Sequence, residues 1–324
     1  MVHRTLQACA LVVALVIAAL AGDARAQGYP ERPVRLLVGF PAGGPSDIPA
    51  RIVAEKLQTA LGQPVVVENK TGAAGMIALN DMLAQPRDGH ALLLCSYLDA
   101  SNTLLYRNVA YKLEDVQPIS LVSKAYYAFT VPTALPAKSM QEFIAHAKTR
   151  PGQLNYGRVG NGSVTELLAK QLEKVAGISM VGVPFRGTGP ALQEVAGGRL
   201  EFMVGPLALS LPLHEGGQVR IIGLTSPERL AAAPNLPTLT EQGVPITNYG
   251  WWGVCGAAGM PKRVLDRLSK EVVAAVNSPD YRSVMERSGA IPLASTPEEM
   301  AAVIAETLRD TAALIKELDI KQLE

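Results

Sequence analysis

Four glycine-rich segments contain the residues best suited to chemistry in this sequence. Each follows a short apolar run and precedes a stretch with helical spacing. Glycine lets a ligand approach the backbone N–H groups, and a helix N-terminus leaves further N–H groups unpaired. Together with the helix dipole, such loops can hold an anion without a charged side chain. The segments are PAGGPSD (41–47), NKTGAAG (69–75), GRVGNGS (157–163) and FRGTGP (185–190).

Ordinary tight turns are the alternative interpretation of any one loop, but two in each half of the chain favour ligand binding. The sequence has no GxxxxGK[ST] phosphate loop, no GxSxG nucleophile elbow and no complete GxGxxG. His90, His146 and His214 are isolated, so no metal cluster can be drawn. We therefore predict no catalytic residues, no metal and no cofactor.

Length and composition favour a globular protein of about two domains. The chain has 324 residues, of which 48% are hydrophobic and 18% charged. With 30 basic and 29 acidic residues, the net charge is +1. This composition excludes a disordered chain, and the balanced charge disfavours nucleic acid or a polybasic membrane surface as partner.

The first 26 residues have the layout of a secretory signal peptide. His3 and Arg4 precede an apolar run at 9–21, and Ala24 and Ala26 provide the small residues of a cleavage site. The run is too short to span a membrane as a helix. We predict cleavage after Ala26; an uncleaved anchor and a lipoprotein are the weaker alternatives.

The rest of the chain alternates strands with helices. The first part predicts strand, helix, strand, helix, strand, which is typical of a parallel sheet covered by helices. These elements lie at 33–40, 48–61, 64–68, 76–85 and 91–95. Later strands are predicted at 125–131, 154–156, 180–184, 202–204, 220–225 and 249–255, and later helices at 139–148, 163–176, 191–196, 262–276 and 297–317.

Two cysteines remain after the leader, Cys95 and Cys255, each in an apolar strand-like run. Export would permit a disulfide, but a sequence does not place two sulfurs within bonding distance. Two buried free thiols are the favoured interpretation.

Several motifs in order give the chain a family resemblance from about residue 29 to 318. They include YPERPVRLLVGFPAGGPSD, VVVENKTGAAG, DGHALLL, LPAKSMQEFIAHAKTRPGQLNYG, GNGS, VPFRGTGPAL, PNLPTLTEQGVP and WWGVCGAAGMP. In these it resembles the substrate-binding proteins of tripartite tricarboxylate transporters, the Bug or TctC-like family. The resemblance implies a non-enzymatic, monomeric periplasmic protein that captures a small carboxylate and delivers it to the membrane subunits of the transporter.

The resemblance also implies an α/β fold of the type II periplasmic-binding-protein kind. Two lobes are expected, joined by a hinge of two crossovers near 124–128 and 248–253. The signal peptide is 1–26, lobe 1 is 27–126 plus 249–324, and lobe 2 is 127–248. Closure of the lobes on the ligand, as in a Venus flytrap, is the expected mechanism.

The ligand-binding residues that the resemblance implies lie in the four loops and directly after the third strand. In lobe 1 they are Ala42, Gly43, Gly44, Ser46, Asp47, Thr71, Gly72, Ala73, Ala74, Gly75, Ser96 and Tyr97. In lobe 2 they are Arg158, Gly160, Asn161, Gly162, Ser163, Phe185, Arg186, Gly187 and Thr188.

Three positions depart from the family's pattern. Arg158 stands where a small residue is frequent, Glu166 where histidine is frequent, and Gly205-Pro206 where an acidic residue is frequent. Arg158 could clamp a carboxylate or lie solvated beside the cleft, and Glu166 opposes an anion unless Arg158 compensates. These changes favour a dicarboxylate with an apolar middle, including an aromatic one, over a citrate-like ligand.

Other functional classes stay open at this point. A ligand-sensing partner of a signalling receptor and an exported enzyme acting on an anionic substrate are the alternatives. Trp251 and Trp252 could line the ligand site, but hinge-strand core is the favoured interpretation.

Overall fold

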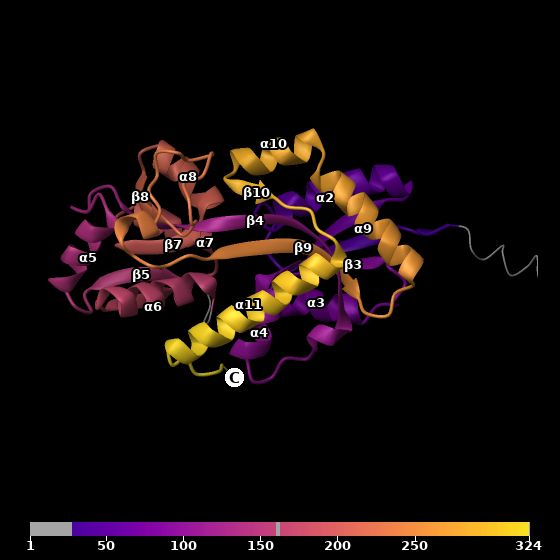
Figure 1. The fold of residues 1–324 in the computed structure, drawn as a ribbon, viewed down its shortest axis with the longest axis horizontal. Coiled ribbons are helices and arrows are strands. Elements are labelled where there is room, and N and C mark those ends of the chain that lie inside the picture. The colour runs from indigo at the N-terminus through magenta and orange to yellow at the C-terminus, as the bar shows by residue number, and fades with distance from the viewer. Residues whose placement is uncertain (1–27, 160–162, 324) are drawn as a thin grey trace, which may run out of the picture.

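The structure, a computed structural model, describes residues 28–159 and 163–323. The predicted signal peptide and its cleavage site lie outside the described residues. One mixed sheet of ten strands runs through the described chain and has helices on both faces (Figure 1).

The first half of the sheet comes from the N-terminal alternation of strands and helices. Its central strand, β1, pairs in parallel with β2 and β3, and Leu36 and Leu37 of β1 are fully buried because helices cover both faces. The elements are β1 (Val34–Val38), α2 (Asp47–Leu61), β2 (Val65–Asn69), α3 (Met76–Leu83), β3 (Ala91–Ser96) and α4 (Tyr97–Leu105).

The second half repeats this arrangement with the middle of the chain. Its strand β5 pairs in parallel with β6 and β7, and the stacked rings of Phe143 and Phe202 lie in the core between helix and sheet. The elements are α5 (Met140–Lys148), β5 (Leu154–Arg158), α6 (Val164–Ala176), β6 (Met180–Pro184), α7 (Thr188–Ala196), β7 (Phe202–Pro206), α8 (Leu207–Glu215) and β8 (Val219–Leu224).

Two long strands connect the halves. β4 (Val116–Pro132) pairs antiparallel with β9 (Tyr249–Ala257) over its first part, and with β7 and β8 over its last part. β9 inserts between β3 and β4, which gives the strand order β2-β1-β3-β9-β4-β7-β5-β6. The sheet is therefore mixed, whereas the sequence pattern indicated only its parallel parts. The lobe boundaries near 126 and 248 stay a prediction.

The C-terminal segment returns to the first half. It forms α9 (Lys262–Val276), α10 (Pro279–Arg287), the short β10 (Ala290–Pro292) and α11 (Pro297–Glu317). The last helix, yellow in Figure 1, also reaches the second half. Thr311 of α11 lies 3.4 Å from Ser101 of α4, and Lys174 of α6 donates to the backbone carbonyl of Glu317 at 2.7 Å.

Many predicted elements are confirmed to within a few residues, and their ends have local causes. Helix α2 ends where Gly62 adopts a left-handed φ of 70°, and Ser139 caps α5 by accepting from the Glu142 N–H. The sequence pattern did not indicate α4, α8, α10, β10 or the first half of β4. Helix α8 was hidden by an internal proline, Pro212.

The expectation of two free thiols is wrong. Cys95 and Cys255 form a disulfide, with their Cα atoms 5.9 Å apart. The antiparallel register of β3 and β9 brings them together, because it places Cys95 opposite Gly253 and Leu93 opposite Cys255. The apolar runs were recognised as strands, but their pairing over 160 residues of chain was not visible in the sequence.

Candidate functional site

The first glycine loop, between β1 and α2, is held by the carboxylate of Asp47. This side chain is 3% exposed and accepts hydrogen bonds from the Gly43 backbone N–H (2.9 Å), the Arg51 guanidinium (2.7 Å) and the Asn69 amide (2.9 Å). The Asn69 amide also donates to the Phe40 carbonyl at 3.0 Å. Because Asn69 begins the second loop, one network joins both loops.

The ionisation of Asp47 follows from this network. Burial by itself would raise its pKa, but the hydrogen bonds from Arg51, Gly43 and Asn69 outweigh burial and lower the pKa below its usual value. The carboxylate is thus ionised at neutral pH and compensated by Arg51. Both carboxylate oxygens accept hydrogen bonds from the protein itself, so Asp47 holds the loop in position and does not contact the ligand directly.

The second glycine loop carries unusual backbone conformations. Ala73 and Ala74 have φ of 45° and 52°, and Gly72 and Gly75 also have positive φ. Such strain in non-glycine residues is typical of functional loops. Thr71 to Ala73 are exposed, as is Ala42 of the first loop, so the backbone there is open to a ligand, whereas the Gly43 N–H is already used by Asp47.

The two loops also touch directly through glycines. A Cβ atom on Gly39 would lie 2.7 Å from the Cα atom of Gly75 and 3.1 Å from its carbonyl oxygen. Gly39, at the end of β1, was not among the predicted site residues, and Asn69 and Arg51 were missed as well. Arg51 was detectable, since it stands one helical turn after Asp47.

The hydroxyl groups of two predicted site residues, Ser46 and Ser96, already form hydrogen bonds within the protein. Ser46 accepts a hydrogen bond from the indole of Trp252 (2.8 Å), and Ser96 caps α4 by bonding to Asp99. Trp251 and Trp252 are buried in strand β9, at 2% and 7% exposed. Roles of Ser46 and Ser96 in binding a ligand stay predictions.

Tyr97 lies where the two halves meet. Its hydroxyl lies close to Tyr127 of β4 and to the backbone of Val164, the first residue of α6, and Tyr97 and Val164 line the same cavity. The start of α4, directly after β3, therefore faces the start of α6, which follows β5. Since β1 and β2 lie beside β3 and run parallel, their loops border the same side of the molecule.

In the second half, the third loop leads from β5 into α6. Gly160, Asn161 and Gly162 lie outside the described residues. Ser163 caps α6 by accepting from the Glu166 N–H at 3.3 Å, and Arg158 lies 3.3 Å from the Glu166 carboxylate. The positive charge of Arg158 offsets the negative charge of Glu166, which would otherwise repel an anion bound nearby.

The fourth loop leads from β6 into α7 and is bonded to the third. The Phe185 N–H donates to the Arg158 carbonyl at 2.8 Å. Gly187 precedes the first turn of α7, Thr188 is its first residue, and Arg186 is exposed. Both loops of this half thus lie at the carboxyl ends of neighbouring parallel strands, β5 and β6.

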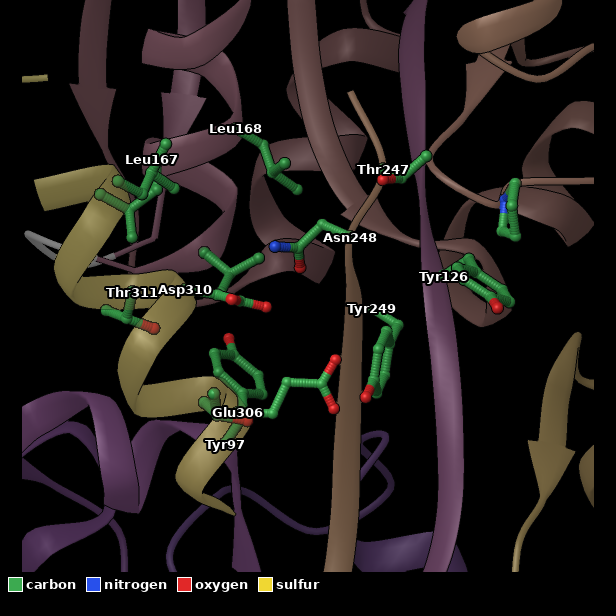
Figure 2. A pocket seen from close by; sticks show the side chains of 14 residues that line it. Tyr97, Tyr126, Leu167, Leu168, Thr247, Asn248, Tyr249, Glu306, Asp310 and Thr311 are labelled. Atoms are coloured by element: carbon green, nitrogen blue, oxygen red, sulfur yellow. The ribbon is translucent and has the colours of Figure 1, made fainter. Parts of the chain in front are cut away.

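A cavity of about 310 Å³ lies between α11, α6 and the start of β9 (Figure 2). Two acidic side chains of α11 point into it, and aliphatic and tyrosine side chains form much of its wall. The negative charge disfavours a carboxylate close to α11, although Tyr97, one of the predicted ligand-binding residues, also lines this cavity. It is lined by Tyr97, Tyr126, Val164, Leu167, Leu168, Pro227, Thr247, Asn248, Tyr249, Glu306, Thr307, Asp310, Thr311 and Leu314.

A second cavity, of about 270 Å³, is lined in part by the disulfide and Asp99. The Asp99 carboxylate is buried and accepts from the Ser96 N–H (2.7 Å) and hydroxyl (3.2 Å). Burial raises the pKa of Asp99 to about 6, because these hydrogen bonds do not offset the loss of water.

This raised pKa predicts a pH-dependent stability. Between about pH 4 and 6 the unfolded chain loses the proton while folded Asp99 keeps it, so the contribution to stability falls as pH rises. Asp99→Asn removes the effect: the free energy of unfolding of this variant minus that of the parent should be about 2–3 kcal/mol larger at pH 7 than at pH 4, so the variant gains stability relative to the parent. Urea unfolding at four pH values measures this difference. Asp115→Asn, which changes another capping carboxylate, is the control. A stability difference between Asp99→Asn and the parent that does not change with pH would contradict the prediction.

Neither a metal centre nor a membrane span was found in residues 28–159 and 163–323. No group of three His, Cys, Asp or Glu there could hold a metal ion. No helix in the same ranges is both long and apolar enough to cross a membrane.

Known proteins resemble this chain over nearly its whole length. The family model described as "Tripartite tricarboxylate transporter family receptor" matches residues 49–320. Protein BugT of Bordetella pertussis is 30% identical over 311 residues, which cover 95% of each protein. Among solved structures, R. palustris Rpa4515 with adipate has a TM-score of 0.86 at 28% identity, covering 91% of this chain and all of that one.

A further solved structure is MatC from Rhodopseudomonas palustris with bound malate. It has a TM-score of 0.81 at 27% identity, covering 89% of this chain and 100% of that one. Together with a TM-score of 0.84 to the solved periplasmic binding protein BugD, at 29% identity and covering 91% of this chain and 100% of that one, they confirm the expected fold class, two α/β lobes of the periplasmic-binding-protein kind joined by two crossovers. The chain belongs to the tripartite tricarboxylate transporter receptor family of solute-binding proteins, TctC.

Proposed function

We propose that this protein binds a small carboxylate between its two lobes and delivers it to a tripartite membrane carrier. One observation carries the proposal: in each half, two loops lie side by side at the carboxyl ends of parallel strands, and the halves meet at Tyr97 and Val164. Carboxyl ends of parallel strands are where α/β proteins bind ligands. The loops offer backbone N–H groups, which suit an anion.

The chemical class of the ligand is a dicarboxylate with an apolar middle. Arg158 is compensated by Glu166, so Arg186 and backbone donors supply the positive potential of the second half. Gly205 of β7 is buried beside the Thr188 methyl group and adds no polar side chain near the start of α7. Relatives with bound adipate and malate support a dicarboxylate.

Localisation and mechanism follow from the same proposal. The signal peptide is removed after Ala26 and the mature protein works in the periplasm. Lobe 1 (27–126 plus 249–324) and lobe 2 (127–248) close about the hinge when the ligand bridges them. The closed form is then the state that the membrane subunits recognise.

Sensing for a signalling receptor is the alternative role. A strain that lacks this protein, keeps uptake of the ligand and loses a transcriptional response to it would indicate sensing.

A thermal-shift screen with a carboxylate panel tests the binding. A ligand that binds only the folded state stabilises it by about 2.7 kcal/mol at 100 times its Kd, which raises the melting temperature by several degrees. Straight-chain dicarboxylates should exceed monocarboxylates and citrate. The proposal fails if no member of a broad panel, at matched ionic strength, shifts the melting temperature.

Asp47→Asn is expected to weaken carboxylate binding about tenfold. The substitution removes a charged acceptor from Arg51 and Gly43, so the first loop loses its fixed geometry. Calorimetric titration with the best dicarboxylate measures the change. Asp266→Asn is the matched control, because Asp266 also pairs with a cation four residues away but in exposed α9. Equal affinity of Asp47→Asn and parent would contradict the assigned role.

A further inference from the structure

A buried side chain of α4 reaches the second glycine loop. Asn102 is 1% exposed, and its side-chain amide donates a hydrogen bond to the Ala74 carbonyl at 3.2 Å. Asn102 was not among the predicted site residues, because the sequence pattern did not indicate α4. Its amide connects the loop to an element that stands 28 residues later in the chain.

The loop conformation at this point is one that alanine adopts reluctantly. Ala73 has a φ of 45°, and Ala74 has a φ of 52° with a ψ of 33°, which is the left-handed helical region. For a residue with a Cβ atom this region is sterically unfavourable. Such a backbone persists where the surrounding contacts enforce it. Two alanines in succession therefore need a partner that holds them.

The two ends of the loop are held by contacts with β1. At its start, the Lys70 N–H donates to the Val38 carbonyl at 2.8 Å. At its end, Gly75 is buried and lies against the residue that follows β1. The hydrogen bond from Asn102 acts between these ends, on Ala74, where the left-handed residues lie.

Helix α4 is itself well fixed, so it can serve as a support. Its N-terminus is capped by Ser96 and Asp99. The buried Tyr111 hydroxyl donates to the Asp99 carbonyl at 2.5 Å, and α11 packs against the helix (Figure 1). At its other end, the Leu323 N–H donates to the Leu105 carbonyl at 2.7 Å. A side chain on such a rigid element holds its partner more precisely than a side chain on a loop.

We propose that Asn102 is a positioning residue for carboxylate binding. Its hydrogen bond to Ala74 keeps the left-handed turn in place, and this turn presents the exposed backbone of residues 71–73 to the ligand. This role rests on the proposed function, in which the loop binds the carboxylate. Asn102 is buried, so it acts through the loop and does not contact the ligand.

Amide hydrogen exchange of the mature protein tests the positioning without any ligand. The Gly75 N–H donates to the Gly72 carbonyl at 3.0 Å, across the turn, so its exchange rate reports whether the turn stays closed. In Asn102→Ala we expect this N–H to exchange about tenfold faster than in the parent, because the turn opens more often.

Calorimetric titration with the best dicarboxylate tests the effect on binding. Asn102→Ala should lose about tenfold in affinity, because the loop donors are no longer held in one geometry. Adding Ala74→Gly should restore most of this loss, since glycine adopts a left-handed φ without steric cost. A merely structural role of Asn102 would give the same loss of affinity in both backgrounds.

Gln242→Ala is the matched control. The half-buried amide of Gln242 also donates to a backbone carbonyl, that of Ile222 in β8 at 2.8 Å, which lies outside the glycine loops. This variant should lower the melting temperature without changing the exchange of Gly75 or the affinity. If Asn102→Ala does not fold, Asn102→Asp replaces it, because this change keeps the side-chain shape and removes the donor.

Three results would each overturn the role of Asn102. They are unchanged exchange of Gly75 in Asn102→Ala, unchanged affinity of this variant, and an affinity loss that Ala74→Gly does not reduce. Failure of the proposed function gives a different pattern, because the parent itself would then bind no carboxylate. The exchange of Gly75 would still decide whether Asn102 holds the loop.

Discussion

Gly39→Ala is expected to abolish most carboxylate binding while the protein still folds. The added methyl group would overlap the backbone of Gly75, which is not a flexible side chain that could turn away. The first and second loops must separate, at a cost of about 1–3 kcal/mol in stability. Loss of one or two hydrogen bonds to a carboxylate then weakens affinity about tenfold to a hundredfold.

Two measurements separate these effects. Urea unfolding gives the stability, and calorimetric titration with the best dicarboxylate gives the affinity. Gly189→Ala is the control for stability alone, since a Cβ atom there meets nothing within 4 Å and the residue lies in helix α7, within the fourth glycine loop. It should stabilise slightly, by about 1 kcal/mol or less. If Gly39→Ala melts and binds as the parent does, direct contact between the two loops is unimportant.

Removal of the disulfide is expected to have the largest effect on stability. Cys95→Ala/Cys255→Ala frees a loop of 160 residues in the unfolded chain, for which chain entropy gives a loss of up to about 5 kcal/mol. Both residues are buried, so small cavities add to the loss. For a chain of this size, the melting temperature should fall by roughly 5–15 °C.

Calorimetry of the double variant and of both single variants measures this loss. Each single variant should be close to the double variant, because either change breaks the bond. The parent in reducing agent should approach them once the bond is reduced. Two titratable thiols in the oxidised, unfolded parent, or an unchanged melting temperature in the double variant, would show that the cysteines do not pair.

Elements with a strong local signal were predictable. The helix at 262–276 was predicted with the bounds found, because apolar residues recur along one face and a proline precedes it. The first half of β4 was missed, since Pro118 and several serines interrupt its apolar pattern. Helix α4 was missed because it begins directly after β3: Ser96 ends the strand and caps the helix, with no loop between them.

The candidate site divides in the same way. The glycine loops and Asp47 were visible in the sequence because their residue types are unusual. The link through Asn69 depends on the parallel register of β1 and β2, which sets Val38 opposite Asn69. The acidic cavity depends on where α11 crosses the sheet, which no local pattern specifies. Register and crossing are long-range properties, so the sequence alone did not indicate them.

The position of β9 has a consequence for how the protein is made. Residues 249–257 form β9, which lies between β3 and β4, so the sheet of the first half is incomplete until most of the chain has been synthesised. Cys95 likewise waits for Cys255 before the bond can form. The export proposed above would require the chain to stay unfolded until it has crossed the membrane. This strand order delays folding until the last quarter of the polypeptide is present.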